Sequence, residues 1–300
     1  MRVFITGASG FIGRRVVQEL LGNGHQVLGL TRSEEGARAL AAAGAEVQRG
    51  DVADAGCLRL GVSRADGVIH TAFNHDFSTF AANCEADRKV IQTLGGLLAG
   101  SARPLVVTSA IAVVRASAGA AARETDPAAD SRVSPRAASE EAAAEVAARG
   151  VHVALLRLSQ VHDTVKQGLV SDLVRLARAK GVAACAGDGR QRWPAAHIDD
   201  VARLYRLALE HGVPGAVHHA VAEEGVSLRE MAATIARGLQ VPVASLAPEA
   251  VDAHFGWLSK FATLDMPASS AKTQALLGWR PTGPTLLADL ARMRWHDAPG

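Results

Sequence analysis

The feature that most constrains this chain is a set of glycines directly after its first apolar segment. Residues 2–6 are typical of a buried strand, and the apolar spacing of residues 16–21 predicts a helix. Gly7, Gly10 and Gly13 lie between them. A strand, a glycine turn and a helix in this order form the phosphate-binding unit of a doubly wound sheet, because the positive helix N-terminus faces a pyrophosphate. The pattern therefore predicts dinucleotide binding.

Each glycine has its own part in this prediction. Gly7 turns the chain off the strand, Gly10 lets backbone N–H groups approach the phosphates, and Gly13 lets the helix pack against the strand. Phe11 and Ile12, which separate the last two glycines, are expected cofactor contacts as well. The first spacing is three residues rather than two, so the pattern is a variant of the common dinucleotide fingerprint. An ordinary glycine-rich turn is the alternative.

The end of the next predicted strand, residues 26–30, indicates which dinucleotide is bound. An NAD site usually has a carboxylate there for the ribose 2′-hydroxyl, and this chain has none. Arg32 could instead bind a 2′-phosphate through charge-assisted hydrogen bonds. We therefore expect NADP rather than NAD. The alternative is a solvated surface arginine beside Glu34 and Glu35.

Composition excludes several classes of function. The 300 residues, 48% of them hydrophobic, allow one large domain or two small ones with a sizeable core. The net charge of +2, without a dense Lys/Arg run, gives no support for nucleic-acid or membrane-surface binding. Cys57, Cys84 and Cys185 are widely spaced, which indicates a reducing compartment and neither a disulfide framework nor a metal site.

No targeting or membrane-spanning segment is predicted. The chain opens on a strand rather than a signal peptide, and no apolar stretch reaches the ~18 residues that a bilayer requires. We expect a cytoplasmic protein, a monomer or homodimer, whose partner is a small-molecule substrate.

Strands and helices alternate through the first half of the chain. This alternation predicts a Rossmann-type, doubly wound parallel sheet over residues 1–160, covered by helices on both faces. Ser134 and Pro135 are expected to start one of the helices and Gly150 to end it. Beyond the two strands above, strands are predicted at residues 46–49, 67–70, 105–108 and 151–158, and long helices at 77–98 and 136–149.

Ligands bind at the carboxyl ends of the strands in such sheets. The residues that follow the first five strands should therefore line one crevice: Gly7, Arg32, Asp51, Thr71 and Ser109.

The pattern changes after residue 158. Amphipathic helices are predicted at residues 169–180 and 199–211, a short strand at 217–220, and a helix from Ser227 to residue 239. We expect residues 161–300 to form mainly a smaller, mixed substrate-binding lobe, with about 197–222 contributing to the first domain. Residues 115–133 form a long polar loop, a kind that is usually functional or disordered.

Five motifs together resemble the extended short-chain dehydrogenase/reductase superfamily, which includes nucleotide-sugar epimerases and dehydratases. They are Thr6–Gly13, Gly50–Val52, His70–Ala72, His197–Ala202 and Leu277–Pro281. The first is similar to the opening motif, and the last two are similar to a late motif at the lobe junction and a C-terminal signature. The resemblance implies an adenine contact at Asp51 and Val52. It places Thr71, Ala72 and Phe73 beneath the nicotinamide ribose.

The catalytic positions depart from the family. Its members usually carry Asn, Ser or Thr, and a Tyr-x-x-x-Lys pair. The corresponding positions here are Asp87, Ala110 with Ser109 beside it, Arg136 and Glu140. An arginine stays protonated near neutral pH and cannot act as the general acid. The resemblance is thus to an atypical subgroup with a degenerate tetrad.

Arg136 and Glu140 also have a simpler interpretation. Their i,i+4 spacing on one helix is ordinary for a surface ion pair. The sole tyrosine, Tyr205, has no lysine at the fourth position after it, so it does not replace the missing pair.

Other residues are candidates for proton transfer or substrate binding. His75 with Asp76, and His162 with Asp163, follow strands and could relay protons, or could be exposed loop residues. Residues 187–193 hold two arginines and a tryptophan that could clamp an anionic or sugar-like substrate, or could form a turn with an anchoring tryptophan. Cys84 and Cys185 are expected in the core.

We therefore expect an NADP-dependent oxidoreductase or epimerase/dehydratase-like enzyme that acts on a small molecule without a catalytic tyrosine. Its catalytic groups are expected among Asp87, Ser109, Arg136 and Glu140. The alternative is a protein that binds NADP without turnover, as a redox sensor or scaffold, which the loss of all four usual catalytic residues would favour.

Overall fold

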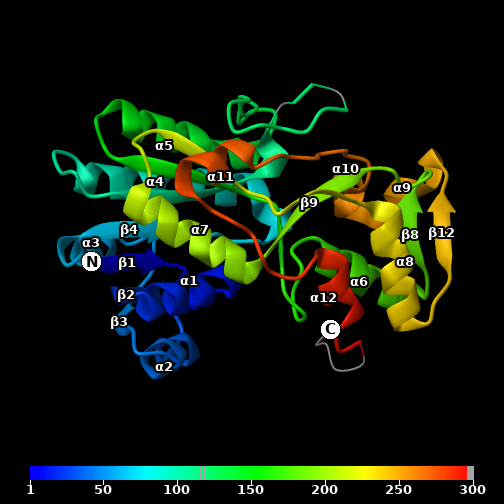
Figure 1. Ribbon diagram of the computed structural model, residues 1–300, viewed down its shortest axis with the longest axis horizontal. Helices are drawn as coiled ribbons and strands as arrows, with labels where there is room; N and C mark the ends of the chain where they lie inside the picture. Colours follow the sequence, from blue (N-terminus) through cyan, green and yellow to red (C-terminus); the bar gives the residue numbers. More distant parts are fainter. Residues whose placement is uncertain (115, 118, 296–300) are drawn as a thin grey trace.

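A seven-stranded parallel sheet forms the centre of the larger lobe. The computed structural model describes residues 1–114, 116–117 and 119–295. The order of the strands is β10-β6-β5-β4-β1-β2-β3, so the doubly wound sheet is confirmed (Figure 1). The strands are β1 (Arg2–Thr6), β2 (Gln26–Thr31), β3 (Glu46–Arg49), β4 (Gly67–His70), β5 (Leu105–Ala110), β6 (Val153–Leu158) and β10 (Ala216–Ala220).

Helices cover both faces of this sheet because its strands bury alternate residues on each side. Val3 and Ile5 pack with α1 (Phe11–Gly22) and α7 (Ile198–His211). Phe4, between them, packs on the opposite face. That face is covered by α3 (Ala55–Ser63), α4 (Phe80–Leu98) and α5 (Ala138–Ala148), while α2 (Glu34–Ala42) links β2 and β3.

The smaller lobe has a core of its own, built around the buried Trp193. Two small sheets, β11-β9-β7 and β12-β8, pack against helices in this lobe (Figure 1). The strands are β7 (Gln160–His162), β8 (Ala183–Ala186), β9 (Arg192–His197), β11 (Glu223–Ser227) and β12 (Val243–Leu246). The helices are α6 (Val170–Lys180), α8 (Leu228–Leu239), α9 (Pro248–Phe255), α10 (Ser259–Ala262) and α12 (Leu286–Ala291).

Some predicted elements differ in detail. The strand predicted at residues 217–220 is β10, which pairs with β6 at the edge of the main sheet. A 3₁₀ turn (Phe77–Thr79) precedes α4, and another (Pro135–Ala137) precedes α5. Ser134 occupies the N-cap position of that second turn, but its side chain makes no capping hydrogen bond.

The predicted loop at residues 115–133 is held by the rest of the chain, although Arg115 and Ala118 lie outside the described residues. The backbone of Ala122 exchanges hydrogen bonds with Pro267 and Ser269. The buried Glu124 accepts hydrogen bonds from the backbone and the hydroxyl of Thr273, in α11 (Ala271–Leu277). In the part of the chain that the structure describes, no helix is long and apolar enough to cross a membrane.

The late motif and the C-terminal signature form one buried clamp. Asp200, in the first turn of α7, accepts hydrogen bonds from the backbone N–H groups of Thr282 and Gly283 and pairs with Arg203. The indole N–H of Trp279 donates to the backbone oxygen of Asp200 at 2.9 Å. Both Asp200 and Trp279 are buried, so the backbone of Asp200 joins the two distant motifs, and its carboxylate holds the backbone just after the C-terminal signature.

Removing this carboxylate should destabilise the fold. We expect Asp200→Ala to lower the free energy of unfolding by about 3 kcal/mol, because it removes a buried carboxylate that accepts hydrogen bonds from two backbone N–H groups and pairs with Arg203. The neighbouring Asp199 has a half-exposed side chain that pairs with Arg15. Asp199→Ala should therefore cost less than ~0.5 kcal/mol in the same urea denaturation experiment. Equal losses in the two variants would show that the clamp contributes nothing.

Candidate active site

The glycine turn between β1 and α1 has a backbone that only glycine fits at two positions. Gly7 has a φ of +70°, and a Cβ atom there would lie 2.6 Å from the backbone nitrogen of Ala72. A Cβ atom on Gly13 would lie 2.1 Å from the Gly7 oxygen. Gly10 meets only the Gly7 oxygen, at 3.1 Å, and is the N-cap of α1 without a side-chain cap. The first turn of α1 is therefore open to an anionic ligand.

Arg32 lies directly after β2 with its side chain 80% exposed. Its guanidinium is 3.5 Å from the carboxylate of Asp51, which follows β3. Glu34 pairs with Arg49 instead, and Arg49 also donates a hydrogen bond to the backbone oxygen of Arg32. Arg32 and Asp51 are therefore close together at the carboxyl edge of the sheet, with Val52 next to them in sequence.

The segment after β4 lies against the glycine turn. The Thr71 hydroxyl donates to the backbone oxygen of Thr6 at 2.8 Å. Ala72 is the residue that a Cβ atom on Gly7 would strike. Phe73 is half-buried beneath the guanidinium of Arg136, which lies 4.2 Å from the centre of its ring.

A buried carboxylate organises the degenerate tetrad. One oxygen of Asp87, on α4, lies 2.9 Å from Nε2 of His70, and the other accepts a hydrogen bond from Arg136 at 2.9 Å. The second ring nitrogen of His70 lies 2.6 Å from the Thr6 hydroxyl. Asp87 and His70 are 5% and 1% exposed. A chain of polar contacts thus runs from β1 through β4 and α4 to Arg136.

The environment of Asp87 keeps it ionised. Burial by itself would raise the pKa of this carboxyl, but His70, Arg136 and the Ser139 hydroxyl outweigh burial and lower the pKa to about 2. The charge of Arg136 is therefore matched by a permanent negative charge at neutral pH.

Arg136 is held in one orientation by several groups. In addition to its ion pair with Asp87, it donates to the Ser139 hydroxyl and to the backbone oxygen of Thr108. Phe73 lies beneath the guanidinium plane. The side chain remains 12% exposed. Its hydrogen bonds to the described residues use three of the five guanidinium N–H groups, which leaves donors for a ligand.

Glu140 forms a second buried pair, with Arg157 on β6. Its two oxygens accept hydrogen bonds from Nε and one terminal nitrogen of Arg157, at 3.0 and 2.9 Å. The Ser109 hydroxyl donates to Glu140 at 2.7 Å. Arg136 and Glu140 therefore bond to other partners, and the interpretation of their i,i+4 spacing as a surface ion pair is wrong. Tertiary partners replace the local one because both side chains point into the protein.

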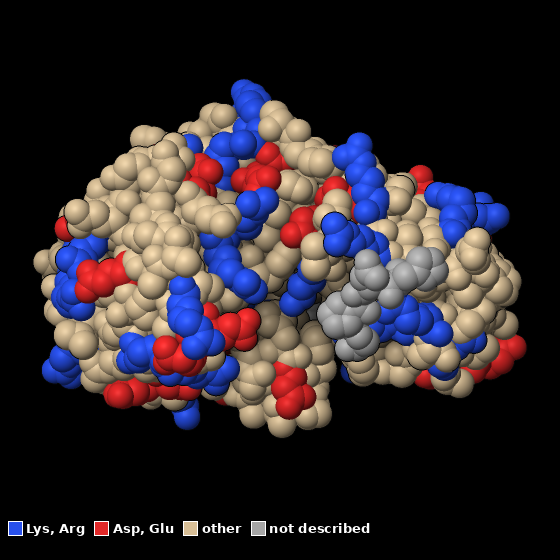
Figure 2. Space-filling model, turned by 90° about the horizontal axis from the view of Figure 1, so that it is seen from below, with Lys and Arg blue, Asp and Glu red and all other residues tan. Residues whose placement is uncertain are grey.

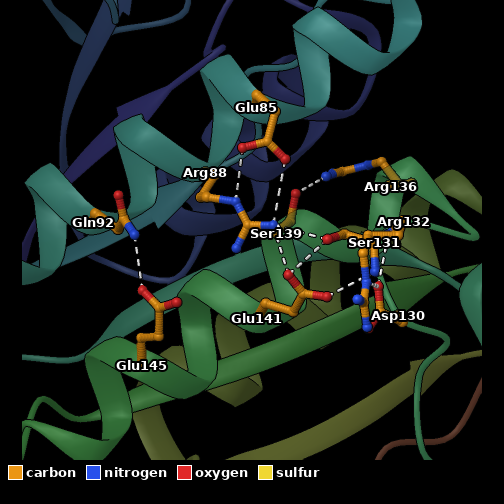
Figure 3. Close-up of polar contacts among 10 residues, drawn as sticks. All are labelled: Glu85, Arg88, Gln92, Asp130, Ser131, Arg132, Arg136, Ser139, Glu141 and Glu145. Carbon is orange, nitrogen blue, oxygen red and sulfur yellow. Dashed lines mark hydrogen bonds and ion pairs between the residues drawn. The ribbon is translucent and has the colours of Figure 1, made fainter.

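A third, outer set of contacts lies between α4 and α5. Arg88 bridges Glu85 on its own helix and Glu141 on α5, while Glu141 also accepts from Ser131 (Figure 3). Arg136 lies on the other side of Ser139 from this set (Figure 3). These contacts tie the loop that precedes Arg136 to both helices.

Tyr205 has no accessible hydroxyl. It is fully buried, its OH lies 2.6 Å from the Thr108 hydroxyl, and burial raises the pKa of the phenol. Tyr205 is therefore part of the support beneath Arg136, because Thr108 bonds to both residues.

The two histidine candidates have different environments. His75 contacts the edge of the Phe73 ring at 5.0 Å, and desolvation together with the charges of Lys166 and Arg136 lowers its pKa. His162 lies on β7, is fully buried, and its Nδ1 lies 2.7 Å from Asp289, so the alternative of an exposed loop residue is wrong.

The prediction that residues 187–193 clamp a substrate is also wrong, because its tryptophan is not accessible. Trp193 is fully buried in the second lobe, with its indole N–H bonded to the backbone oxygen of Phe261, so it cannot stack on a substrate. Arg192 pairs with Asp265, and Arg190 with Asp188. Trp193 therefore anchors the turn, as the alternative interpretation of this segment predicted. Cys84 and Cys185 are buried as predicted.

Arg157 and Lys166 were not singled out from the sequence, and His70 was noted only as the first residue of the His70–Ala72 motif, not as a partner of Asp87. Lys166, in the loop after β7, lies over Phe11 of the glycine turn at 5.6 Å from the ring centre. A charged residue within an otherwise apolar strand is the one local signal that could have indicated Arg157.

One face of the molecule has a hollow near its middle. Lys and Arg side chains lie beside this hollow, together with Asp and Glu side chains (Figure 2). Among the described residues, no group of three or more His, Cys, Asp or Glu side chains could hold a metal ion.

Comparison with known proteins identifies the family. The model of the NAD-dependent epimerase/dehydratase family matches residues 3–221. The chain belongs to this family. Its members are oxidoreductases and epimerases that use a nicotinamide cofactor, and this family member is an enzyme of that kind.

The chain is also similar to three known proteins. An uncharacterized protein of Schizosaccharomyces pombe, C2A9.02, is 44% identical over 97% of this chain and 98% of its own length. A 2-alkyl-3-oxoalkanoate reductase of Stenotrophomonas maltophilia is 30% identical over 72% and 67%. The dTDP-glucose 4,6-dehydratase DesIV of Streptomyces venezuelae, solved with NAD bound, has a TM-score of 0.79 and 22% identity over 99% and 97%, and so shares the fold.

The Asp87 carboxylate generates a prediction on acid stability. Its pKa of about 2 in the folded protein lies below the ordinary value of 3.8, so its contribution is complete above pH 3.8 and is lost as the pH falls to about 2. Asp87→Asn should lower the free energy of unfolding at pH 7 by about 3 kcal/mol, because Arg136 loses its buried partner. The variant should also lose less stability than the parent between pH 4 and pH 2.

Urea denaturation at a series of pH values measures both effects. Glu85→Gln is the matched control, since Glu85 lies on the same helix with a largely exposed side chain. Identical acid profiles for the parent and Asp87→Asn would contradict the assignment of the low pKa to Asp87.

Proposed function

We propose that this protein is an NADP-dependent oxidoreductase that interconverts a carbonyl and an alcohol on a small molecule, without a catalytic tyrosine. The observation that carries the proposal is the fixed guanidinium of Arg136, which occupies the tyrosine position with donors left for a ligand. The reductase of Stenotrophomonas maltophilia, by its name, acts on a 3-oxo compound. That relationship favours carbonyl chemistry over epimerisation or dehydration.

The residues present fit a dinucleotide. The open first turn of α1, with Gly10, Phe11 and Ile12, would bind the pyrophosphate. Asp51 and Val52 would contact the adenine, and the three residues Thr71 to Phe73 would lie beneath the nicotinamide ribose. When bound, the cofactor supplies or accepts the hydride.

Arg32 supports NADP over NAD. It is the cation that directly follows β2, the sequence carries no carboxylate at positions 31–33, and its side chain is 80% exposed and can reach a 2′-phosphate. Asp51, 3.5 Å away, offsets part of its charge.

NADPH should therefore bind at least ~10-fold more tightly than NADH, a difference of about 1.4 kcal/mol. Arg32→Ala should remove most of this difference, because the 2′-phosphate loses its planar donor. Isothermal titration with both cofactors measures it. Equal affinities in the parent protein would show that NADP is not preferred.

Two variants serve as controls in that titration. Arg64→Ala removes an arginine that pairs with Glu46, at the opposite end of α3 from the crevice, and should leave both affinities unchanged. Gly10→Val should abolish binding of both cofactors while the fold survives, since a side chain there meets only one backbone oxygen.

Arg136 would orient the substrate and stabilise negative charge on its oxygen during the reaction. It cannot transfer a proton, because it stays protonated. Asp87 would act through Arg136, by fixing its position and balancing its charge. Ser109 and Glu140 would hold the β5 edge beneath the site through their bonds to each other and to Arg157.

His75 is the group that we assign to proton transfer. Its ring contacts Phe73 at the edge of the site, beside Arg136. A lowered pKa keeps the imidazole neutral at pH 7, which suits it to accept the proton of an alcohol. Oxidation should therefore need a deprotonated His75, and its rate should fall as the pH decreases through that lowered pKa.

A second candidate function has one observation in its favour. The two unusual charges of the tetrad are each neutralised within the protein, Arg136 by Asp87 and Glu140 by Arg157. A binding protein without turnover, such as a redox sensor, would show the same internal pairing. A measurement of turnover distinguishes the oxidoreductase from the binding protein.

The decisive assay uses a panel of ketones and aldehydes with NADPH. Arg136→Lys should lower kcat/KM at least ~10-fold, because an ammonium cannot reproduce the planar fork. With the matching alcohols and NADP⁺, His75→Gln should lower kcat and remove the pH dependence of the oxidation. Arg132→Lys, at a nearby exposed arginine, should change neither. Tight NADPH binding without turnover of any compound would favour the second function.

A further inference from the structure

Aromatic side chains are scarce in this chain, yet four of them form one continuous series between the lobes. Only seven Phe, four Trp and one Tyr are present among 300 residues. The ring centres of Phe73 and Phe80 are 6.0 Å apart, those of Phe80 and Phe77 are 5.2 Å apart, and Phe77 stacks on Trp257 at 4.1 Å. We call these four residues the aromatic ladder.

The aromatic ladder does not serve the hydrophobic cores. None of its residues belongs to the core clusters that the described residues form. Phe73, Phe77 and Phe80 are half-buried, and Trp257 is 47% exposed. Large rings left partly in water in this way mark a binding surface more often than a packing one.

Both sides of the aromatic ladder are anchored to rigid elements. On the first lobe, Asp76 accepts hydrogen bonds from the backbone and hydroxyl of Ser78, and Asn83 donates to the backbone oxygen of Asp76. This fixes the turn that carries Phe77. On the second lobe, Trp257 stands between the buried Phe255 and Leu258.

The aromatic ladder begins at the proposed reaction site. Phe73 lies beneath the guanidinium of Arg136, and His75 contacts the edge of the same ring. From there the rings continue through Phe80 and Phe77 to the second lobe. A substrate whose oxygen bonded to Arg136 would therefore place the rest of its body along the rings.

We infer that the aromatic ladder is a wall of the substrate site and that its occupant is a planar aromatic carbonyl compound or the matching alcohol. The inference rests on the proposed oxidoreductase function. Phe77 is itself stacked on Phe80 and Trp257, so the ring edges and the exposed part of Trp257 are what attract flat apolar groups, by edge and stacking contacts. Ring faces offer no hydrogen-bond partners to the many hydroxyls of a sugar, so the site differs in kind from one built for a sugar nucleotide.

The test compares benzaldehyde with cyclohexanecarbaldehyde, which differ mainly in the planar ring. We expect Trp257→Leu and Phe77→Leu each to lower the ratio of the two kcat/KM values about fivefold with NADPH. Using the ratio cancels the different intrinsic reactivities of the two aldehydes. Trp257→Phe should restore most of it. Leu60→Ala, at a half-exposed leucine on α3, is the control and should not change it.

A binding experiment tests the same inference without turnover. Saturation-transfer NMR on the NADPH-bound protein should detect binding of naphthalen-2-ylmethanol. Trp257→Leu should weaken that signal severalfold. Cyclohexylmethanol, which lacks a planar ring, should give a weak signal with both the parent protein and the variant. Binding of the naphthyl probe without turnover of any carbonyl would overturn the proposed function and leave this inference standing. Ratios and signals unchanged in both leucine variants, or absence of naphthyl binding, would overturn the inference and reduce the aromatic ladder to a contact between lobes.

Discussion

The site depends on one buried carboxylate, that of Asp87. It lies between a histidine of the central sheet and the arginine that replaces the family's tyrosine. An isolated charge at 5% exposure would be strongly unfavourable, so the pair and its hydrogen bonds must form together. Because Asp87, His70 and Arg136 come from three different elements, their contacts also fix how α4 and the start of α5 sit against the sheet.

The second pair, Glu140 with Arg157 on β6, is another buried ion pair, two strands along the sheet from His70 on β4. Its bidentate geometry is the form in which arginine binds a carboxylate most strongly. At the positions that the resemblance aligns with the family's usual catalytic residues, the chain carries members of two fixed ion pairs. These pairs offer a substrate hydrogen-bond donors in fixed positions, and neither pair transfers a proton.

Local signals were enough to predict the fold. The glycine turn, the strand ends and the helix-ending glycines each involve a few neighbouring residues, so their conformational needs can be inferred from the sequence. The partner of Arg136 lies 49 residues away in the chain. Spacing on one helix therefore predicted Glu140 as its partner, and only the folded sheet brings Asp87 to it. The same reason explains why His162 and Trp193 were expected near the surface, although packing between elements buries them.

Paired burial of opposite charges also restricts how such a sequence can change over time. Replacing Arg136 by tyrosine would leave Asp87 without the guanidinium that pairs with it. Replacing Glu140 by lysine would place a second cation against Arg157. Each single step toward the usual Tyr–Lys pair thus passes through a destabilised protein. The two members of each ion pair are therefore expected to change together. A homologue should carry both Asp87 and Arg136 or neither, and the same holds for Glu140 and Arg157.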